Sequence, residues 1–270
     1  MGKENPELMT FGGHLEVLRR MFFRVLAVVA ILAIGVFCLK DITFELLFAP
    51  TSNEFCLYSW IEKISSFFDG EFRFDDFSVQ LISTELSAQF MTHLTSSLYL
   101  ALLLASPYIL FELYAFVAPA LYEEEKRYSV IVVVLVYFLF ALGILLCYFV
   151  IFPISFRFLA TYQVADTVEN TITLSSYIST FTSLTLMMAL VFQLPIVSYV
   201  LAKIGIITSN VLKNYRKHAV LVIAFVSAVI TPPDILTCLL VMGPLYLLYE
   251  CSIGVVAFVE RKSEGNDPIL

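Results

Sequence analysis

The 270-residue chain is 60% apolar and 14% charged, with a mean hydropathy of +0.88, whereas a soluble globular domain normally carries about a quarter charged residues. This composition excludes a soluble domain, and the net charge of −7 opposes nucleic acid as a partner, because phosphates require a basic surface. Five scattered cysteines and three histidines predict neither a disulfide framework nor a metal site, and no cofactor is expected.

Six apolar stretches follow one another along the chain and predict six transmembrane helices. They cover residues 21–39, 86–118, 128–153, 178–202, 217–231 and 235–257, within a single integral membrane domain of residues 1–270. A span needs about 20 residues to cross a hydrocarbon core of roughly 30 Å. The first stretch reaches this length only if Arg24 extends its guanidinium to the lipid headgroups. The fifth stretch is short, since the 13 residues from Ala219 to Thr231 cover only about 20 Å.

The connections between the spans predict the orientation of the chain. Residues 40–85 interleave acidic with aromatic residues, which predicts a folded cap on the extracytoplasmic surface of the membrane. Of the 16 lysine and arginine residues, 12 lie on one side of the membrane. This side comprises the two termini, the connection between spans two and three (the 2/3 connection) and the connection between spans four and five (the 4/5 connection). Because basic residues are retained on the cytoplasmic side, both termini are predicted to be cytoplasmic.

Sequence patterns of catalysis are missing from the chain. It contains no H-E-x-x-H pair, no G-x-S-x-G turn and no glycine-rich phosphate loop. The serine and threonine cluster of residues 173–185 has no nearby histidine or lysine that could activate a nucleophile. We therefore expect no enzyme activity.

Polar side chains inside the apolar stretches are informative, since lipid makes them costly. Glu112 stands seven residues before Pro119, about 10 Å inside the second span. It either faces protein or water, or extends toward the interface. Gln193 stands in the middle of the fourth span, before a kink expected at Pro195. Its amide either bonds to another helix or lines a polar path.

Acidic residues also stand at the predicted cytoplasmic helix ends. Glu123, Glu124 and Glu125 form a run of carboxylates in the 2/3 connection. They either complement the dipole of the next helix or bind a guanidinium bidentately. Glu16 precedes Arg20 by four residues, which predicts an intrahelical ion pair worth about 0.2–0.5 kcal/mol.

Three segments of the chain match the motifs of a known family when they are taken together. They are residues 106–127, which contain FELYAFVAPALY, residues 231–250, which contain TPPD and PLYLLYE, and the amino-terminal His14-Leu15 with Leu18-Arg19. These segments resemble the TatC family, the core subunit of the twin-arginine protein translocase. The resemblance covers nearly the whole chain in order.

The resemblance implies an all-α polytopic membrane protein with six transmembrane helices in a concave, glove-like arrangement and both termini cytoplasmic. It implies a receptor for twin-arginine signal peptides that is also the core of a translocase, which exports folded proteins across the cytoplasmic (inner) membrane and is driven by the proton-motive force. The implied partners are signal peptides of precursor proteins, single-span TatA/TatB-type subunits, membrane lipid and further copies of the chain. No covalent chemistry is implied.

The resemblance also assigns residues to two sites. Signal-peptide binding is expected at Glu125, Glu16, Arg19, Phe116, Glu123 and Glu124. The family's second acid usually stands where this chain has Val17, so the acid one residue earlier or a loop acid is expected to replace it. An intramembrane polar set is expected to contact partner helices and consists of Gln193, Glu112, Thr231, Asp234 and Glu250.

Two other functions stay open at this point. A secondary transporter would line a solute or proton path with Glu112, Gln193 and Glu250, although no inverted repeat or pair of glycine-broken helices is visible. A structural membrane subunit would use the same polar groups only to join helices. Binding of a twin-arginine precursor that is lost when its arginines become lysines separates the three functions.

Overall fold

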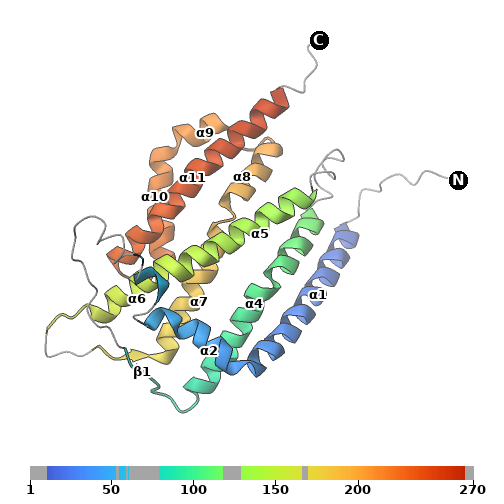
Figure 1. Cartoon of the computed structure of the whole chain (residues 1–270). Helices are drawn as coiled ribbons and strands as arrows, with labels where there is room; N and C mark the ends of the chain where they lie inside the picture. The colour runs from blue at the N-terminus through green and yellow to red at the C-terminus, as the bar shows by residue number, and fades with distance from the viewer. Residues whose placement is uncertain are drawn as a thin grey trace, which may run out of the picture. The chain divides into compact units, whose positions relative to one another are not determined.

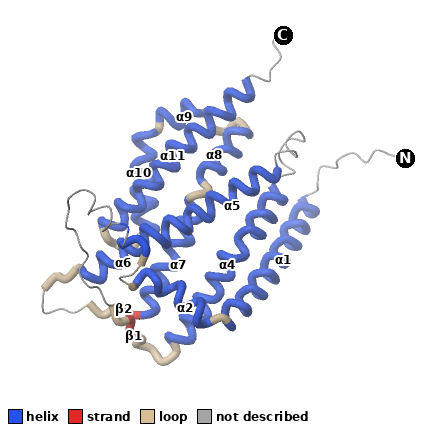
Figure 2. Tube along the Cα trace, viewed as in Figure 1, coloured by secondary structure: helices blue, strands red, loops and turns tan. Residues whose placement is uncertain are grey.

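The computed structural model describes residues 11–52, 55–58, 60, 79–117, 129–165 and 170–264. These residues are almost entirely helical (Figure 1, Figure 2). The helices are α1 (Phe11–Cys38), α2 (Lys40–Phe48), α4 (Ala88–Val117), α5 (Ser129–Leu146), α6 (Phe152–Thr161), α7 (Leu174–Val191), α8 (Leu194–Lys203), α9 (Ser209–Asn214), α10 (Arg216–Ile230) and α11 (Ile235–Glu264). The chain forms two compact units, a first unit of Met1–Thr43 and His93–Tyr137 and a second unit of Phe44–Thr92 and Phe138–Leu270.

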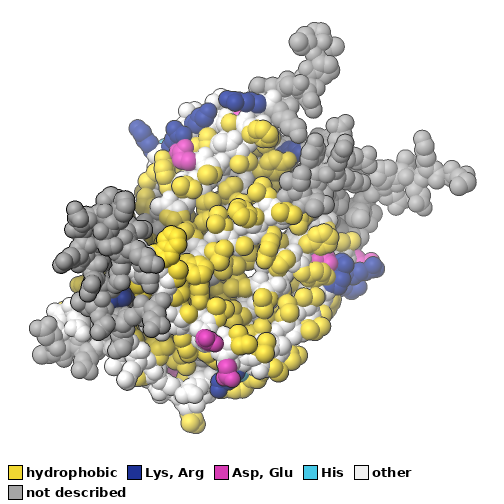
Figure 3. Space-filling view, viewed as in Figure 1, with side chains coloured by type: hydrophobic (Ala, Val, Ile, Leu, Met, Phe, Trp, Pro, Cys, Tyr) yellow, Lys and Arg dark blue, Asp and Glu magenta, His cyan; other side chains and the backbone are white. Residues whose placement is uncertain are grey.

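Five helical segments in the described ranges are long and apolar enough to cross a membrane. They are Leu15–Cys38, Ala88–Leu113, Val133–Thr161, Leu174–Lys203 and Ile235–Arg261. The sixth predicted span corresponds to α10, which has only 15 residues, as its short apolar stretch indicates. Figure 3 shows apolar side chains over most of the coloured surface, as expected of helices that contact lipid.

The helices of the third and fourth spans extend beyond the apolar stretches that predicted them. The third helix continues from α5 through a π-helical turn, Cys147–Ile151, into α6, and therefore ends at Thr161. Pro153 does not break it, because this proline lies in the first turn of α6, directly after the wider π turn. The fourth helix begins at Leu174, since the side chain of Thr173 caps it by accepting a hydrogen bond from the Ser176 backbone N–H.

In the first unit, α1 packs against α4 around two small side chains. Ala101 and Ala105, one turn apart on α4, are buried in an apolar cluster with Val29 of α1. Small residues allow membrane helices to approach closely and to gain van der Waals contacts. Near the end of α1, the rings of Phe37 and His93 stack with their centroids 4.0 Å apart. These contacts align α1 and α4 antiparallel.

In the second unit, tyrosine hydroxyls satisfy backbone carbonyls at the end of α2. Tyr148 of the π turn donates a hydrogen bond to the carbonyl oxygen of Leu46 at 2.9 Å. Tyr177 of α7 donates one to the carbonyl oxygen of Leu47 at 2.7 Å. The last carbonyls of a helix have no partner within the helix. The two hydroxyls therefore attach the end of α2 to the π turn and to α7.

Tyr58 anchors the segment that follows α2. Its side chain is buried, and its hydroxyl donates a hydrogen bond to the carbonyl oxygen of Pro153 at 3.1 Å. The Arg157 guanidinium lies 4.9 Å from the centroid of the Tyr58 ring, in a cation–π contact. Burial raises the pKa of the Tyr58 hydroxyl, and the charge and hydrogen bond of Arg157 partly oppose this. Tyr58 thus attaches this segment of the predicted cap to α6, and residues 61–78 lie outside the described residues.

One short strand pair complements the helices. Strands β1 (Leu81–Ile82) and β2 (Ile172–Thr173) pair in parallel, with Leu81 opposite Ile172. The pair joins the end of the 40–85 connection to the residues just before α7. Hydropathy does not predict it, because two-residue strands carry no periodic pattern.

Candidate functional site

The first unit holds a buried carboxylate, that of Glu112, between α1 and α4. These two helices also carry described residues of the predicted signal site. Glu112 of α4 has a side chain that is only 9% exposed. Its Oε1 accepts a hydrogen bond from the hydroxyl of Tyr108, one turn earlier on the same helix, at 2.7 Å. The same Oε1 lies 3.3 Å from Nη1 of Arg24 on α1. Glu112 therefore faces protein, and Arg24, predicted to extend to the headgroups, is paired with an acid.

The start of α1 carries an exposed charged surface. Glu16 forms the predicted intrahelical ion pair with Arg20, with Oε1 and Nη2 2.7 Å apart and both side chains more than half exposed. Arg19, Arg20, Phe23 and Arg24 together line one open depression of the surface. Exposed ion pairs contribute little to stability, because water and salt screen them. The Glu16 carboxylate is therefore accessible to another guanidinium.

The other residues of the predicted signal site lie at or beyond the end of α4. Phe116 follows Glu112 by four residues, so the two side chains project from one face of the helix. The Phe116 side chain is half-buried. Glu123, Glu124 and Glu125 lie outside the described residues. Their role in signal binding stays a prediction.

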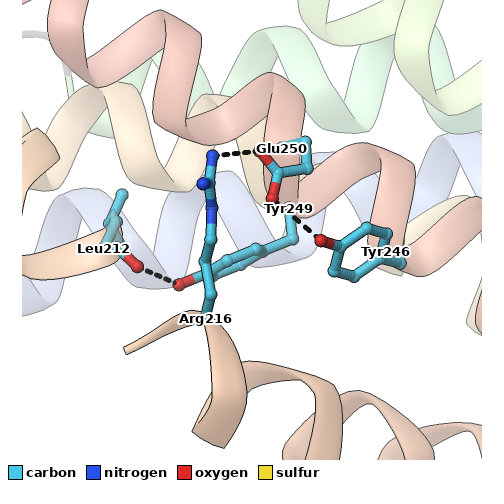
Figure 4. Close-up of polar contacts among 5 residues, drawn as sticks. All are labelled: Leu212, Arg216, Tyr246, Tyr249 and Glu250. Atoms are coloured by element: carbon cyan, nitrogen blue, oxygen red, sulfur yellow. Dashed lines mark hydrogen bonds and ion pairs between the residues drawn. The ribbon is translucent and has the colours of Figure 1, made fainter. Parts of the chain in front are cut away.

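The second unit contains a second set of tyrosine, glutamate and arginine (Figure 4). Glu250 of α11 accepts a hydrogen bond on Oε1 from Tyr246, again four residues earlier, at 3.1 Å. Its Oε2 lies 2.7 Å from Nη2 of Arg216, the first residue of α10. Next to it, the Tyr249 hydroxyl donates a hydrogen bond to the carbonyl oxygen of Leu212 at 2.7 Å. These contacts attach α9 and the start of α10 to α11.

Gln193 lies at a break between two helices. Helix α7 ends at Val191, α8 begins at Leu194, and Pro195 stands in the first turn of α8. The kink predicted from Pro195 is confirmed, because proline has no backbone N–H to continue the α7 ladder. The carbonyl oxygen of Gln193 accepts the backbone N–H bonds of Ile196 and Val197 at 3.0 Å. The break places the Gln193 amide, half-buried, inside an apolar span.

Thr231 and Asp234 form the turn between α10 and α11. The Thr231 hydroxyl donates a hydrogen bond to the carbonyl oxygen of Ser227 at 2.9 Å. Oδ1 of Asp234 caps α11 by accepting the backbone N–H of Thr237 at 2.6 Å. The second oxygen, Oδ2, and the Thr237 hydroxyl are buried with no hydrogen-bond partner in the described part of the chain. Both atoms are enclosed by the chain itself, so the turn keeps two unpaired polar groups among the described residues.

Sequence reasoning missed the side-chain partners of Glu112 and Glu250. Tyr108 and Tyr246 each precede a glutamate by four residues, and this spacing places donor and acceptor on one helix face. The tyrosines could therefore have been identified. Arg24 and Arg216 stand on other helices, so no local pattern connects them to Glu112 or Glu250.

Comparisons with known proteins agree with this architecture. Residues 13–244 match the family described as Sec-independent protein translocase protein (TatC). The TatC protein of Blattabacterium sp. subsp. Periplaneta americana is 32% identical over 264 residues, which cover 96% of this chain and 99% of the relative. The TatC protein of Campylobacter jejuni subsp. jejuni is 32% identical over 254 residues, 94% of this chain and 96% of the relative.

A solved structure has the same fold. The crystal structure of a twin-arginine translocase receptor, TatC, matches with a TM-score of 0.72 and 30% sequence identity. The match covers 92% of this chain and 100% of the other. It confirms the prediction of an all-α polytopic membrane protein.

Proposed function

Because this chain belongs to the TatC family of Sec-independent protein translocase proteins, we propose that it is a receptor for twin-arginine signal peptides and the core of a translocase for folded proteins. The observation that carries this proposal is the match of nearly the whole fold to a twin-arginine translocase receptor. A secondary transporter is disfavoured, because the family and the solved structure that match nearly the whole chain are those of a protein translocase.

The proposed location is the cytoplasmic (inner) membrane, with both termini in the cytoplasm and the 40–85 connection outside. The excess of lysine and arginine on the side of the termini supports this orientation. Transport is proposed to be driven by the proton-motive force, as the family resemblance implies. No residue of the chain is assigned a chemical step.

Signal binding is proposed at the cytoplasmic ends of α1 and α4. Glu125 is the first carboxylate for a signal arginine, because it stands at the matching position of the family motif. Glu16 is accessible on α1, next to Arg19, and Phe116 supplies an apolar surface on α4. Glu123 and Glu124 are the alternatives for further contacts in the same loop.

Single-span TatA/TatB-type subunits are proposed to pack against the intramembrane polar residues of the second unit. Gln193 places a half-buried amide at a helix break inside an apolar span, and the Thr231–Asp234 turn lies at the start of α11. A polar side chain of an incoming helix would hydrogen-bond to such a group, at about 0.6–2 kcal/mol per hydrogen bond in lipid.

Peptide binding to the purified protein in lipid nanodiscs tests the receptor function. A peptide with two consecutive arginines should bind, and the same peptide with two lysines should bind at least tenfold more weakly, because lysine cannot pair bidentately with a carboxylate. Glu125→Ala should weaken binding about 30-fold or more, as expected for losing one partner of a desolvated charge pair. Glu45→Ala is the matched control and should bind normally, because Glu45 is an exposed residue of α2, away from the proposed site in the sequence. Normal binding by Glu125→Ala would remove this residue from the site.

A further inference from the structure

We propose that Glu112 is the second carboxylate for the twin-arginine signal, and that Arg24 is an internal counter-ion which the incoming arginine replaces. The inference rests on the proposed receptor function. It concerns the second acid of the signal site, which this chain lacks at position 17, where it has Val17. The supporting observation is that Glu112, with Tyr108 and Arg24, uses its carboxylate oxygens differently from Glu250, with Tyr246 and Arg216.

Glu112 and Glu250 have similar partners but use their carboxylate oxygens differently. In Glu250, Tyr246 binds Oε1 at 3.1 Å and Arg216 binds Oε2 at 2.7 Å, so both oxygens are engaged. In Glu112, the tyrosine and the arginine both contact Oε1. Oε2 of Glu112 makes no hydrogen bond or ion pair with the residues that the structure describes. Among the described residues, the Glu112 carboxylate therefore has an open position, whereas both oxygens of the Glu250 carboxylate are engaged.

The counter-ion of Glu112 is loosely held. Arg24 makes a single contact of 3.3 Å, whereas charge-assisted hydrogen bonds normally lie at about 2.7–2.9 Å. Its side chain is 58% exposed and lines the open depression together with Arg19, Arg20 and Phe23. Arg24 can therefore turn toward the lipid headgroups, as its place at the start of the first span predicts, without leaving a buried charge of its own. Among the described residues, the lining of the depression includes Arg24 but not Glu112, so a peptide reaches the carboxylate only after Arg24 has turned away.

Glu112 is suited to select a guanidinium. Its side chain is 9% exposed, and attraction between charges strengthens as water is excluded. The bond from Tyr108 orients the carboxylate, and an arginine can then engage both oxygens in a planar fork that lysine cannot form. Glu16 is less suited, because its side chain is about half exposed, so water screens its attraction for a guanidinium.

The decisive experiment compares peptide binding by Glu112→Gln and Glu250→Gln in nanodiscs. Glutamine keeps the size of the side chain and an acceptor for the tyrosine, but removes the charge. Glu112→Gln should weaken binding of the two-arginine peptide by about tenfold or more, and should reduce the preference for arginine over lysine. Glu250→Gln is the matched control and should change binding less than about twofold, because both Glu250 oxygens are already occupied. Equal effects of the two variants overturn the proposal.

Arg24→Gln distinguishes a replaceable counter-ion from a structural partner. If the signal arginine replaces Arg24, removing Arg24 abolishes the competition and should tighten binding of the two-arginine peptide several-fold. If the pair only holds α1 to α4, Arg24→Gln should weaken binding as Glu112→Gln does, and this result overturns the proposal. Each single variant leaves one charge of the pair without its partner, whereas the double variant Arg24→Gln/Glu112→Gln removes both charges. It therefore replaces Glu112→Gln if that variant does not fold, and it should bind the two-arginine peptide as weakly.

Failure of this inference differs from failure of the proposed function. Equal affinity of the wild-type protein for the arginine and lysine peptides refutes both. Selective binding by the wild-type protein, lost in Glu125→Ala but unchanged in Glu112→Gln, refutes only the role of Glu112.

Discussion

Gly143→Ala is expected to destabilise the second unit, because α5 meets α7 there with no room for a methyl group. A Cβ atom at position 143 would lie 2.9 Å from the carbonyl oxygen of Met188 and 3.0 Å from the Cα of Ala189. It would also lie 3.0 Å from Cγ of Phe192. The first two atoms belong to the α7 backbone, so they cannot rotate away as the end of a flexible side chain can.

The size of the effect follows from these distances. Carbon atoms normally meet at about 3.5–4.0 Å, so the helices must separate by roughly 0.5–1 Å, which forfeits a quarter to a half of each displaced contact. Overpacking costs about 1–3 kcal/mol, and the backbone contacts place Gly143→Ala in the upper part of that range. The higher helix propensity of alanine offsets about 0.8–1 kcal/mol. The net loss of about 1–2 kcal/mol should lower Tm by roughly 2–8 °C.

Thermal unfolding in detergent, followed by far-ultraviolet circular dichroism, measures this change. Gly254→Ala in α11 is the matched control, since an added Cβ there meets nothing within 4 Å. It should leave Tm unchanged or raise it. If Gly143→Ala melts at the same temperature as Gly254→Ala, or above it, the close approach of α5 and α7 does not limit the second unit, and the reasoning fails.

Three further predictions concern other parts of the molecule. Tyr177→Phe should lower the free energy of unfolding by about 1–3 kcal/mol in the same melting assay, because the buried Leu47 carbonyl loses its donor; an unchanged Tm would contradict the capping. A variant with Cys56 as its sole cysteine should react with an impermeant thiol reagent added outside cells, whereas a sole cysteine at Gly265 should not, and the reverse result would invert the orientation. Gln193→Glu should retain transport, whereas Gln193→Leu should weaken crosslinking to a single-span partner while peptide binding persists; full crosslinking in Gln193→Leu would leave the amide a structural role.

The sequence by itself determined the features that depend on neighbouring residues. Membrane spans follow from the hydropathy of continuous segments, because each helix satisfies its own backbone hydrogen bonds and must only match its lipid surroundings. The break before Pro195 follows from the missing N–H of proline. The ion pair of Glu16 with Arg20 follows from the helical repeat. The short α10 follows from its short apolar stretch.

Only the tertiary structure decided which distant groups meet. Arg24 reaches Glu112 and Arg216 reaches Glu250 because pairs of helices pack in a particular register, and no local pattern contains that register. The same holds for Tyr177, whose hydroxyl finds a carbonyl at the end of α2. The π turn that carries the third helix past Pro153 is likewise a feature of the folded chain, with Cys147 and Ile151 buried within it. Hydropathy can place a charged group at a depth in the membrane, but the partner of that group depends on helix packing.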